Sequence, residues 1–198
     1  MTKKHIVEGR IWVLSEGGRL IEDIDTDQIF HNAHLHITDI KDMGQYALGN
    51  LKGWEDFPSK AQPGDILAAG RNFGAGSSRQ QAVDCFAALG VAAILAPSFG
   101  AIYFRNAVNS GFPLLRCPEL SDWIQEGTIK SGNRIRFDLL SGSGRNLTMD
   151  LPLGTSGMSR VQADIFQSGD LFSYGQITEG QISEFDQPEF HHKKPYSD

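Results

Sequence analysis

Cysteine is scarce in this chain, which has only Cys85 and Cys117 among its 198 residues. One pair of thiols is too few for the disulfide framework of a small secreted domain. It is also too few for an iron–sulfur cluster, which usually takes roughly three or four thiolates. Any such cluster that works with this protein must be held by another chain. The two cysteines are expected to behave as buried hydrophobic residues.

Long apolar runs are also missing. The longest, residues 91–96, is far shorter than the roughly 20 residues that cross a bilayer as a helix. The N-terminal residues, MTKKHIVEGRIWVL, have neither the apolar core nor the cleavage site of a signal peptide. The sequence therefore predicts a cytoplasmic protein that does not use a membrane as its partner.

Basic clusters are absent as well, since the longest are the pairs Lys3-Lys4 and Lys193-Lys194 and the formal net charge is -6. This balance argues against nucleic acid as a partner, because binding to phosphates needs a basic surface. An anionic small molecule would have to be captured by local groups, since the field of the whole molecule does not attract it.

Hydrophobic residues make up 40% of the chain, enough to build a core. Strands are predicted at residues 5–14, 65–69, 91–96 and 113–116, and helices at residues 43–51, 77–89 and 99–109. The order strand, loop, helix, strand, helix, strand indicates parallel strands joined by crossover helices. The fold class is therefore α/β.

The segment after Cys117 has a different pattern. A helical turn is expected at 120–125, and alternating apolar residues predict a hairpin over 128–151, with Leu147 and Met149 in its second strand. Residues 161–174 are typical of two helices separated by Gly169. We expect one domain over residues 1–180. Residues 181–198 are expected to form a C-terminal tail that is weakly ordered or bound to a partner.

A glycine-rich segment, Gly-Ala-Gly-Ser-Ser-Arg at 74–79, lies between a predicted strand and a predicted helix. It lacks the third glycine of dinucleotide-binding loops and the Gly-Lys-Ser/Thr of phosphate-binding loops. The structural interpretation is a helix start, with Ser78 as N-cap and Gln81 completing a capping box. Arg79 argues against it, because a cation in the first turn opposes the helix dipole. The functional interpretation is a receptor for a carboxylate or phosphate, formed by the free amides of a helix N-terminus.

Three segments carry a resemblance to a known family. Residues 72–79 (NFGAGSSR) resemble the signature of the swivelling domain of aconitase-family enzymes, and 91–99 with 104–106 resemble the strand and helix that follow it. Residues 9–13 and 23–29 are similar to the opening of isopropylmalate dehydratase small subunits. The resemblance extends over residues 7–175. It implies an aconitase-type swivelling domain, with β/β/α layers, a mostly parallel central crossover unit and a flanking β-hairpin.

The resemblance also implies a chemistry. Such a chain is the small subunit of a heteromeric hydro-lyase that isomerises 2-isopropylmalate and 3-isopropylmalate by dehydration and rehydration, in leucine biosynthesis. A [4Fe-4S] cluster is expected in the large subunit, and no cofactor or metal is expected in this chain. Ser77 matches the catalytic base. Gly76, Ser78 and Arg79 match the contacts to the substrate, and Thr26 and Asp27 match the stretch that shapes the site.

Two other groups of residues have weaker similarity to metal-binding patterns. Asp23, Asp25 and Asp27 begin like a calcium-binding loop, but Gln28 replaces the glycine that such a loop requires. His31, His34 and His36 could suggest zinc, although no second group of ligands is visible. The position of His36 is more informative, because the resemblance assigns it to a segment that selects the substrate. The family has an aliphatic residue or arginine there.

His36 therefore leaves the substrate open. Dimethylmalate, citramalate, homocitrate or homoaconitate would be handled by the same chemistry. An alternative from another class is an anion-binding module without catalysis, which the presence of both Ser77 and Arg79 disfavours.

Overall fold

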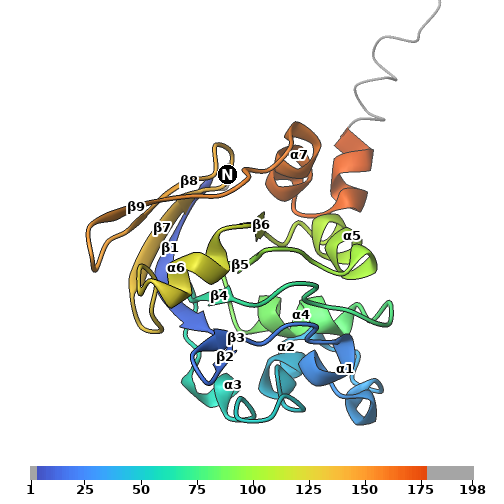
Figure 1. Cartoon of the computed structure of the whole chain (residues 1–198). Coiled ribbons are helices and arrows are strands. Elements are labelled where there is room, and N and C mark those ends of the chain that lie inside the picture. The colour runs from blue at the N-terminus through green and yellow to red at the C-terminus, as the bar shows by residue number, and fades with distance from the viewer. Residues whose placement is uncertain (1–3, 178–198) are drawn as a thin grey trace, which may run out of the picture.

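A computed structural model describes residues 4–177, and residues 1–3 and 178–198 lie outside the described part. Seven of its strands form one sheet, with the spatial order β6-β5-β4-β1-β7-β8-β9 (Figure 1). The strands are β1 (Ile6–Val13), β2 (Ser15–Glu16), β3 (Arg19–Leu20), β4 (Ile66–Ala68), β5 (Ala93–Ala96), β6 (Leu114–Arg116), β7 (Arg134–Asp138), β8 (Ser143–Asn146) and β9 (Leu151–Gly154).

The helices between and after these strands are short. They are α1 (Thr26–Ile29), α2 (Ile40–Met43), α3 (Phe57–Lys60), α4 (Gln81–Ala88), α5 (Ala101–Asn109), α6 (Leu120–Gln125) and α7 (Arg160–Ser168), with 3₁₀ turns η1 (Asn32–His34) and η2 (Gly44–Tyr46) and a last helical segment at 171–177. Across residues 4–177, every helix is too short or too polar to cross a membrane.

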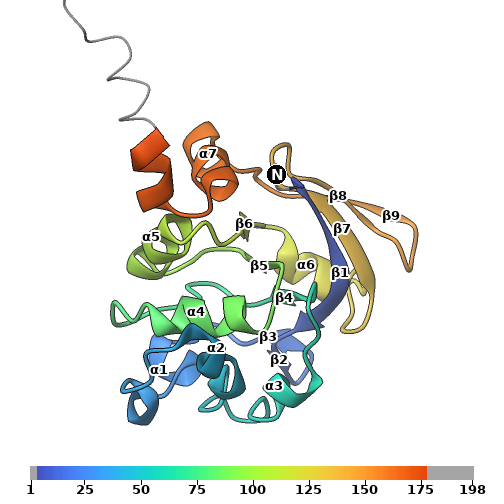
Figure 2. The same cartoon turned by 180° about the vertical axis from the view of Figure 1, so that it is seen from behind.

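The sheet has two halves of different construction. Strands β1, β4, β5 and β6 are parallel, and α4 and α5 connect β4 to β5 and β5 to β6. Strands β7, β8 and β9 continue from β1 as an antiparallel meander. The two halves stand at a steep angle to each other (Figures 1 and 2). A single backbone bridge, Arg116 with Ser156, joins β6 to the segment after β9. The sheet therefore curls until its two ends nearly meet.

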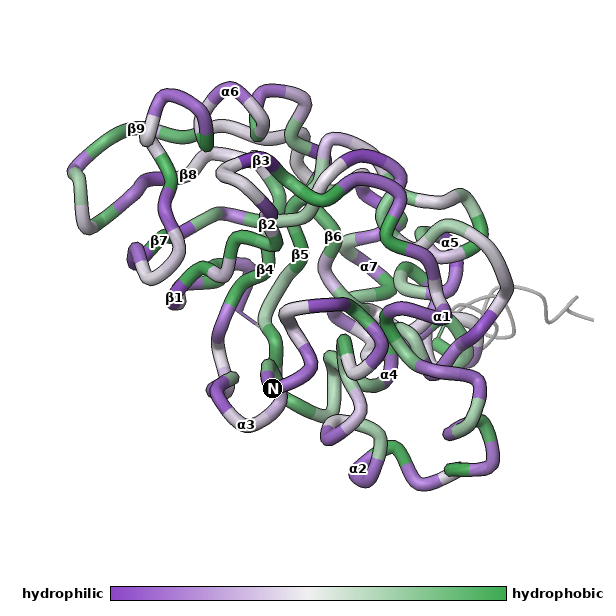
Figure 3. The backbone as a smooth tube through the Cα atoms, turned by 60° about the horizontal axis from the view of Figure 1, so that its bottom comes forward, coloured by the Kyte–Doolittle hydropathy of each residue, from purple (hydrophilic) through white to green (hydrophobic). Residues whose placement is uncertain are grey.

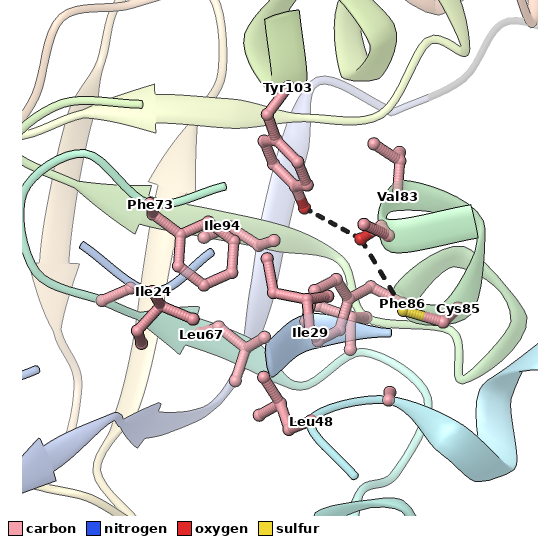
Figure 4. Close-up of a cluster of buried hydrophobic side chains, with 14 of the residues drawn as sticks. Ile24, Ile29, Leu48, Leu67, Phe73, Val83, Cys85, Phe86, Ile94 and Tyr103 are labelled. Carbon is pink, nitrogen blue, oxygen red and sulfur yellow. Dashed lines mark hydrogen bonds between the residues drawn. The ribbon is translucent and has the colours of Figure 1, made fainter. Parts of the chain in front are cut away.

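Apolar side chains fill both faces of the parallel half. One cluster lies between this half and the helices on its outer side, where Phe73, Phe86 and Tyr103 pack beside Ile94 (Figure 4). The other lies inside the curl and joins Ile66 and Leu95 to Phe137 of the meander. The central strands are accordingly among the most hydrophobic parts of the backbone (Figure 3). The layers are antiparallel sheet, parallel sheet and helices, which confirms the predicted α/β class and its β/β/α arrangement.

Two of the predicted elements outside the glycine-rich loop and its helix were wrong in detail. The helix expected at 43–51 is replaced by α2 and η2, because Leu48 adopts a φ of 59° and donates its amide to Ile29. The expected hairpin is a three-stranded meander, in which Leu147 and Met149 lie in the turn between β8 and β9. A pattern of alternating apolar residues did not distinguish these two exposed turn residues from strand residues. The two helices around Gly169 are confirmed, at 160–168 and 171–177.

One buried carboxylate ties β1 to the turn before β4. Asp65 is 3% exposed and its Oδ2 accepts hydrogen bonds from Arg10 at 2.7 Å, from Trp12 Nε1 at 2.7 Å and from the Gln62 amide at 2.9 Å. Burial by itself would raise the pKa of Asp65, but these donors, led by Arg10, hold that pKa below its ordinary value. The ionised form is thus the form that the fold stabilises.

We expect Asp65→Asn to lower the free energy of unfolding at pH 7 by roughly 2 kcal/mol, because it replaces the buried, charged acceptor of three hydrogen bonds by a neutral amide. The wild-type protein should lose this stability as the pH falls below about 4. The variant should lose less over the same range. Urea unfolding between pH 7 and pH 3 measures both effects. Asp150→Asn is the matched control, since that carboxylate is 79% exposed in its pair with Arg145 and such pairs contribute little.

Candidate active site

The glycine-rich loop follows the carboxyl end of β4, where open α/β sheets commonly bind ligands. It is held against the chain that precedes α1. The Gly74 amide donates to Ile24 O at 2.7 Å, and the Thr26 amide donates to Ala75 O at 2.9 Å. Asp25 and Ala75 form a parallel bridge. Segments about fifty residues apart in the sequence therefore run side by side, which brings the predicted Thr26 and Asp27 to the predicted Ser77 and Arg79.

Ser77 is bound to Thr26 by two contacts. Its amide donates to Thr26 Oγ1 at 3.2 Å, and the two side-chain oxygens are 2.9 Å apart. Thr26 is buried, with 2% exposure, whereas Ser77 is exposed. The serine hydroxyl therefore contacts a buried threonine on one side and is accessible to a ligand on the other.

Arg79 is held by α1 through one of its nitrogens. Its Nη1 donates to Asp27 Oδ1 and, at 3.0 Å, to Phe30 O. The hydrogen bond from Arg79, helped by the Asn32 amide, holds the pKa of Asp27 below its ordinary value. Among residues 4–177, neither Nε nor Nη2 of Arg79 has a protein acceptor. One edge of the guanidinium thus remains available for a carboxylate.

Ser78 is positioned through its backbone. Asn106 of α5 donates from Nδ2 to Ser78 O at 3.2 Å, while the Ser78 side chain is exposed. Within the described part of the chain, the amides of Ser78 and Arg79 donate to no protein acceptor. They belong to the two residues that follow Ser77 and are free to bind negative charge.

Gly76 and Gly74 let the loop take this path. Gly76 has a φ of +94°, which side-chain-bearing residues rarely adopt. Gly74 has a φ of +77°, and a Cβ there would lie 2.2 Å from Tyr103 Cγ. Tyr103 is itself fixed by its hydroxyl, which donates to Ala82 O of α4 (Figure 4). The glycines therefore set the loop against α5 and leave Gly76 and Ser77 exposed.

The expected start of the helix was wrong, and so was the capping box built on it; the carboxylate receptor stays a prediction, but its amides do not belong to a helix N-terminus. Helix α4 begins at Gln81, its N-cap is Gln80, and no side chain caps it. Ser78 does not form a capping box, and Arg79 lies before the first turn. Two of the first helical amides are not free either, because Ala82 and Val83 donate to Arg79 O and Gln80 O. Contacts with α1 compete for residues 77–79 and keep them out of the helix.

The three histidines do not form a metal site. His34 stacks on Tyr46, with ring centroids 4.0 Å apart. His31 accepts from the Ala33 amide, and His36 is exposed, with its Nδ1 3.0 Å from Ala33 O. No group of three or more His, Cys, Asp or Glu side chains in residues 4–177 is placed to bind a metal ion. His36 makes no hydrogen bond to the loop at 74–79 within the described residues.

The cysteines do not fit a cluster either. Both are buried, and burial raises the pKa of Cys117 to about 12 and that of Cys85 further. Thiols held in the neutral form inside the core are unsuited to bind iron.

Sequence reasoning missed two residues that organise the site. Asp25 caps α1 in a capping box with Gln28, and this Asp-x-x-Gln signal was present in the sequence. Asn50 donates from Nδ2 to Asp27 Oδ2 at 3.1 Å. No local pattern marks Asn50, because its role depends on how the irregular segment at 44–56 folds back on α1.

The curled β/β/α fold and the serine and arginine on the loop after β4 define a swivelling domain of the aconitase type. The family model described as the aconitase C-terminal domain matches residues 25–119, which include every proposed site residue.

The chain is 34% identical over 168 residues to the 3-isopropylmalate dehydratase small subunit of Thermodesulfovibrio yellowstonii, covering 85% of this chain and 92% of that one. It is 32% identical over 171 residues to the isopropylmalate/citramalate isomerase small subunit of Methanocaldococcus jannaschii, covering 86% and 94%. A crystal structure of 3-isopropylmalate dehydratase from the latter organism matches with a TM-score of 0.78 at 28% identity, over 91% of this chain and 99% of that chain. The chain belongs to the family of 3-isopropylmalate dehydratase small subunits.

Proposed function

We propose that this chain is the small subunit of a hydro-lyase that interconverts 2-isopropylmalate and 3-isopropylmalate in leucine biosynthesis. The observation that carries the proposal is the pair of contacts from α1, Thr26 with Ser77 and Asp27 with Arg79. They hold a solvent-facing hydroxyl and a guanidinium with one free edge on the same short loop. The proposal includes a cytoplasmic location, which suits two free cysteines.

Dehydration of such a substrate removes a proton from a carbon beside a carboxylate and a hydroxide from the next carbon. Ser77 as an alkoxide would take the proton, and the electron pair left behind would form the double bond. Rehydration returns the proton and regenerates the alkoxide. The free amides of Ser78 and Arg79 support this role, because they can stabilise the serine anion. They take the place of the helix terminus that the sequence suggested.

Substrate binding is assigned to Arg79 and the exposed groups beside it. Its free edge can hold a carboxylate by two parallel hydrogen bonds, which fixes the orientation of the substrate. Asp27 remains ionised at neutral pH and keeps the guanidinium in place. Gly76 leaves room for the substrate to approach the backbone.

The site is only half formed in this chain, because Gly76, Ser77 and Ser78 are exposed to solvent. We propose that a large subunit covers them and holds a [4Fe-4S] cluster. When bound, that cluster would act as the Lewis acid for the departing hydroxyl. Citramalate is the second candidate substrate, since one relative is named for both substrates.

The proposal is tested by producing the chain anaerobically together with its large subunit and following enoate formation by absorbance. We expect turnover of isopropylmalate by the pair, and neither turnover nor stoichiometric iron and sulfide on the small chain alone. Ser77→Ala in the assembled pair should lower kcat by about 10²-fold or more. Turnover near that of the wild type would remove Ser77 from the chemistry, and a cluster on the isolated chain would refute the division between two subunits.

We expect Arg79→Lys to raise KM and lower kcat, with a combined loss in kcat/KM of about tenfold or more. Lysine can replace the ion pair with Asp27 but cannot present a second donor edge to a carboxylate. Steady-state kinetics on the assembled pair measure the loss. Arg71→Lys is the matched control, because Arg71 is exposed and pairs with Glu22. Unchanged kinetics in Arg79→Lys would contradict the carboxylate clamp.

His36 is proposed to face the variable group of the substrate. His36→Val should raise the preference for isopropylmalate, and His36→Arg should shift it toward homocitrate, whose additional carboxylate can pair with a permanent cation. The measured quantity is the ratio of kcat/KM for the two substrates. His5→Gln serves as control, since His5 lies beside Gln167 of α7 and not beside the candidate site. A ratio that stays constant in both His36 variants would place His36 outside the pocket.

A further inference from the structure

Thr26 has a hydroxyl that its own helix does not need. The N-terminus of α1 is capped by Asp25, which accepts from the amides of Asp27 and Gln28, and Gln28 Oε1 accepts from the Asp25 amide. The Thr26 hydroxyl is nevertheless buried, which is unfavourable unless it is hydrogen-bonded. Both of its contacts are made to one residue, Ser77.

The protons in this pair can be assigned by counting donors and acceptors. A hydroxyl has one proton to donate and two lone pairs. The Ser77 amide can only donate, so Thr26 Oγ1 accepts from it at 3.2 Å. If Ser77 Oγ also donated to Thr26, the proton of Thr26 would need another acceptor, and none contacts it among residues 4–177. The arrangement that satisfies every group has Thr26 donating to Ser77 Oγ at 2.9 Å.

We infer that Thr26 is the positioning residue that donates a hydrogen bond to Ser77 Oγ and stabilises its ionised form, an inference that rests on the proposed role of Ser77 as base. The donation occupies a lone pair of the serine and leaves the serine's own proton outside the pair, on the exposed side. A hydrogen bond to an anion is shorter and stronger than one to a neutral hydroxyl. Thr26 therefore favours the alkoxide over the alcohol.

The strength of this hydrogen bond changes during the reaction, because the charge of Ser77 changes. In dehydration the substrate proton moves to Ser77 Oγ, and in rehydration it returns to carbon, so the serine alternates between alkoxide and alcohol. The bond from Thr26 is strongest when Ser77 is charged. Its removal should slow turnover and leave the binding of the substrate carboxylates, which is assigned to Arg79, almost unchanged.

The test uses Thr26→Val in the assembled two-subunit enzyme, because valine keeps the shape of threonine and removes the hydroxyl. We expect kcat to fall by about 10²-fold, as when one donor to a developing oxyanion is removed, with little change in KM. The rising limb of kcat against pH should move to higher pH, since the serine anion has lost a stabilising donor. Thr26→Ser, which restores a hydroxyl, should recover most of the activity and return the limb to its original position.

Thr155→Val is the matched control, because it removes a hydroxyl that donates to Gly142 O in the meander. It should leave kcat and the pH profile as in the wild type. If Thr26→Val fails to assemble, Thr26→Ala removes the hydroxyl with a smaller side chain. Loss of assembly in both would give the hydroxyl a structural role and overturn the inference.

The possible failures can be separated. A wild-type pair that turns over isopropylmalate, together with a Thr26→Val pair of equal kcat and unchanged pH profile, refutes the inference and leaves the proposed function standing. A fall in kcat with no movement of the pH limb also refutes it, since that result would mean that Thr26 orients Ser77 but does not stabilise its ionised form. A wild-type pair inactive on every branched malate and on citramalate refutes the proposed function, and the inference falls with it.

Discussion

The contact between the chain around α1 and the loop after β4 is the constraint on which the candidate site depends. Two consecutive residues, Thr26 and Asp27, reach Ser77 and Arg79. The Ala75 amide donates to Ile24 O and the Thr26 amide donates to Ala75 O, which holds the two segments in register. The side chains of Ser77 and Arg79 are held by α1 and its C-cap Phe30, and not by the helix α4 that follows them. Residues 77–79 can therefore stay outside the helix and keep their amides free, because the contacts with α1 fix their conformation.

Ser77 and Arg79 each have one side held by α1 and one side available to a ligand. The sides of Ser77 and Arg79 that face α1 are satisfied by buried or charged partners within the chain. Their other sides carry an exposed hydroxyl, free amides and one free guanidinium edge, which suits a surface that a second protein and a carboxylate complete together. The net charge of -6 means that attraction of an anion depends on these few groups, and so the position of each donor has a large effect.

The sequence was sufficient for the architecture and for the identity of the loop. Buried strands such as β5 have short, wholly apolar patterns, and the residues 72–79 are distinctive enough to indicate the family. It was insufficient where distant contacts override local preference. Residues 77–80 have a helical pattern, yet α1 and Asn106 hold them in a loop. Leu48 sits at a positive φ because its buried side chain and its bond to Ile29 outweigh the local cost. The position of His36 relative to a substrate stays a prediction, since His36 is exposed and makes no hydrogen bond to the loop at 74–79 among the described residues.

The near closure of the sheet also has a consequence for how the chain behaves before it meets a partner. An open sheet offers two rows of unpaired backbone groups that can recruit strands from other molecules. Here β6 is engaged by Ser156, whose amide donates to Arg116 O at 3.0 Å. At the other end, β9 carries Pro152, which has no amide to donate. Each margin of the sheet thus has fewer backbone groups available for pairing, so the isolated chain should resist edge-to-edge aggregation even though its candidate site is exposed.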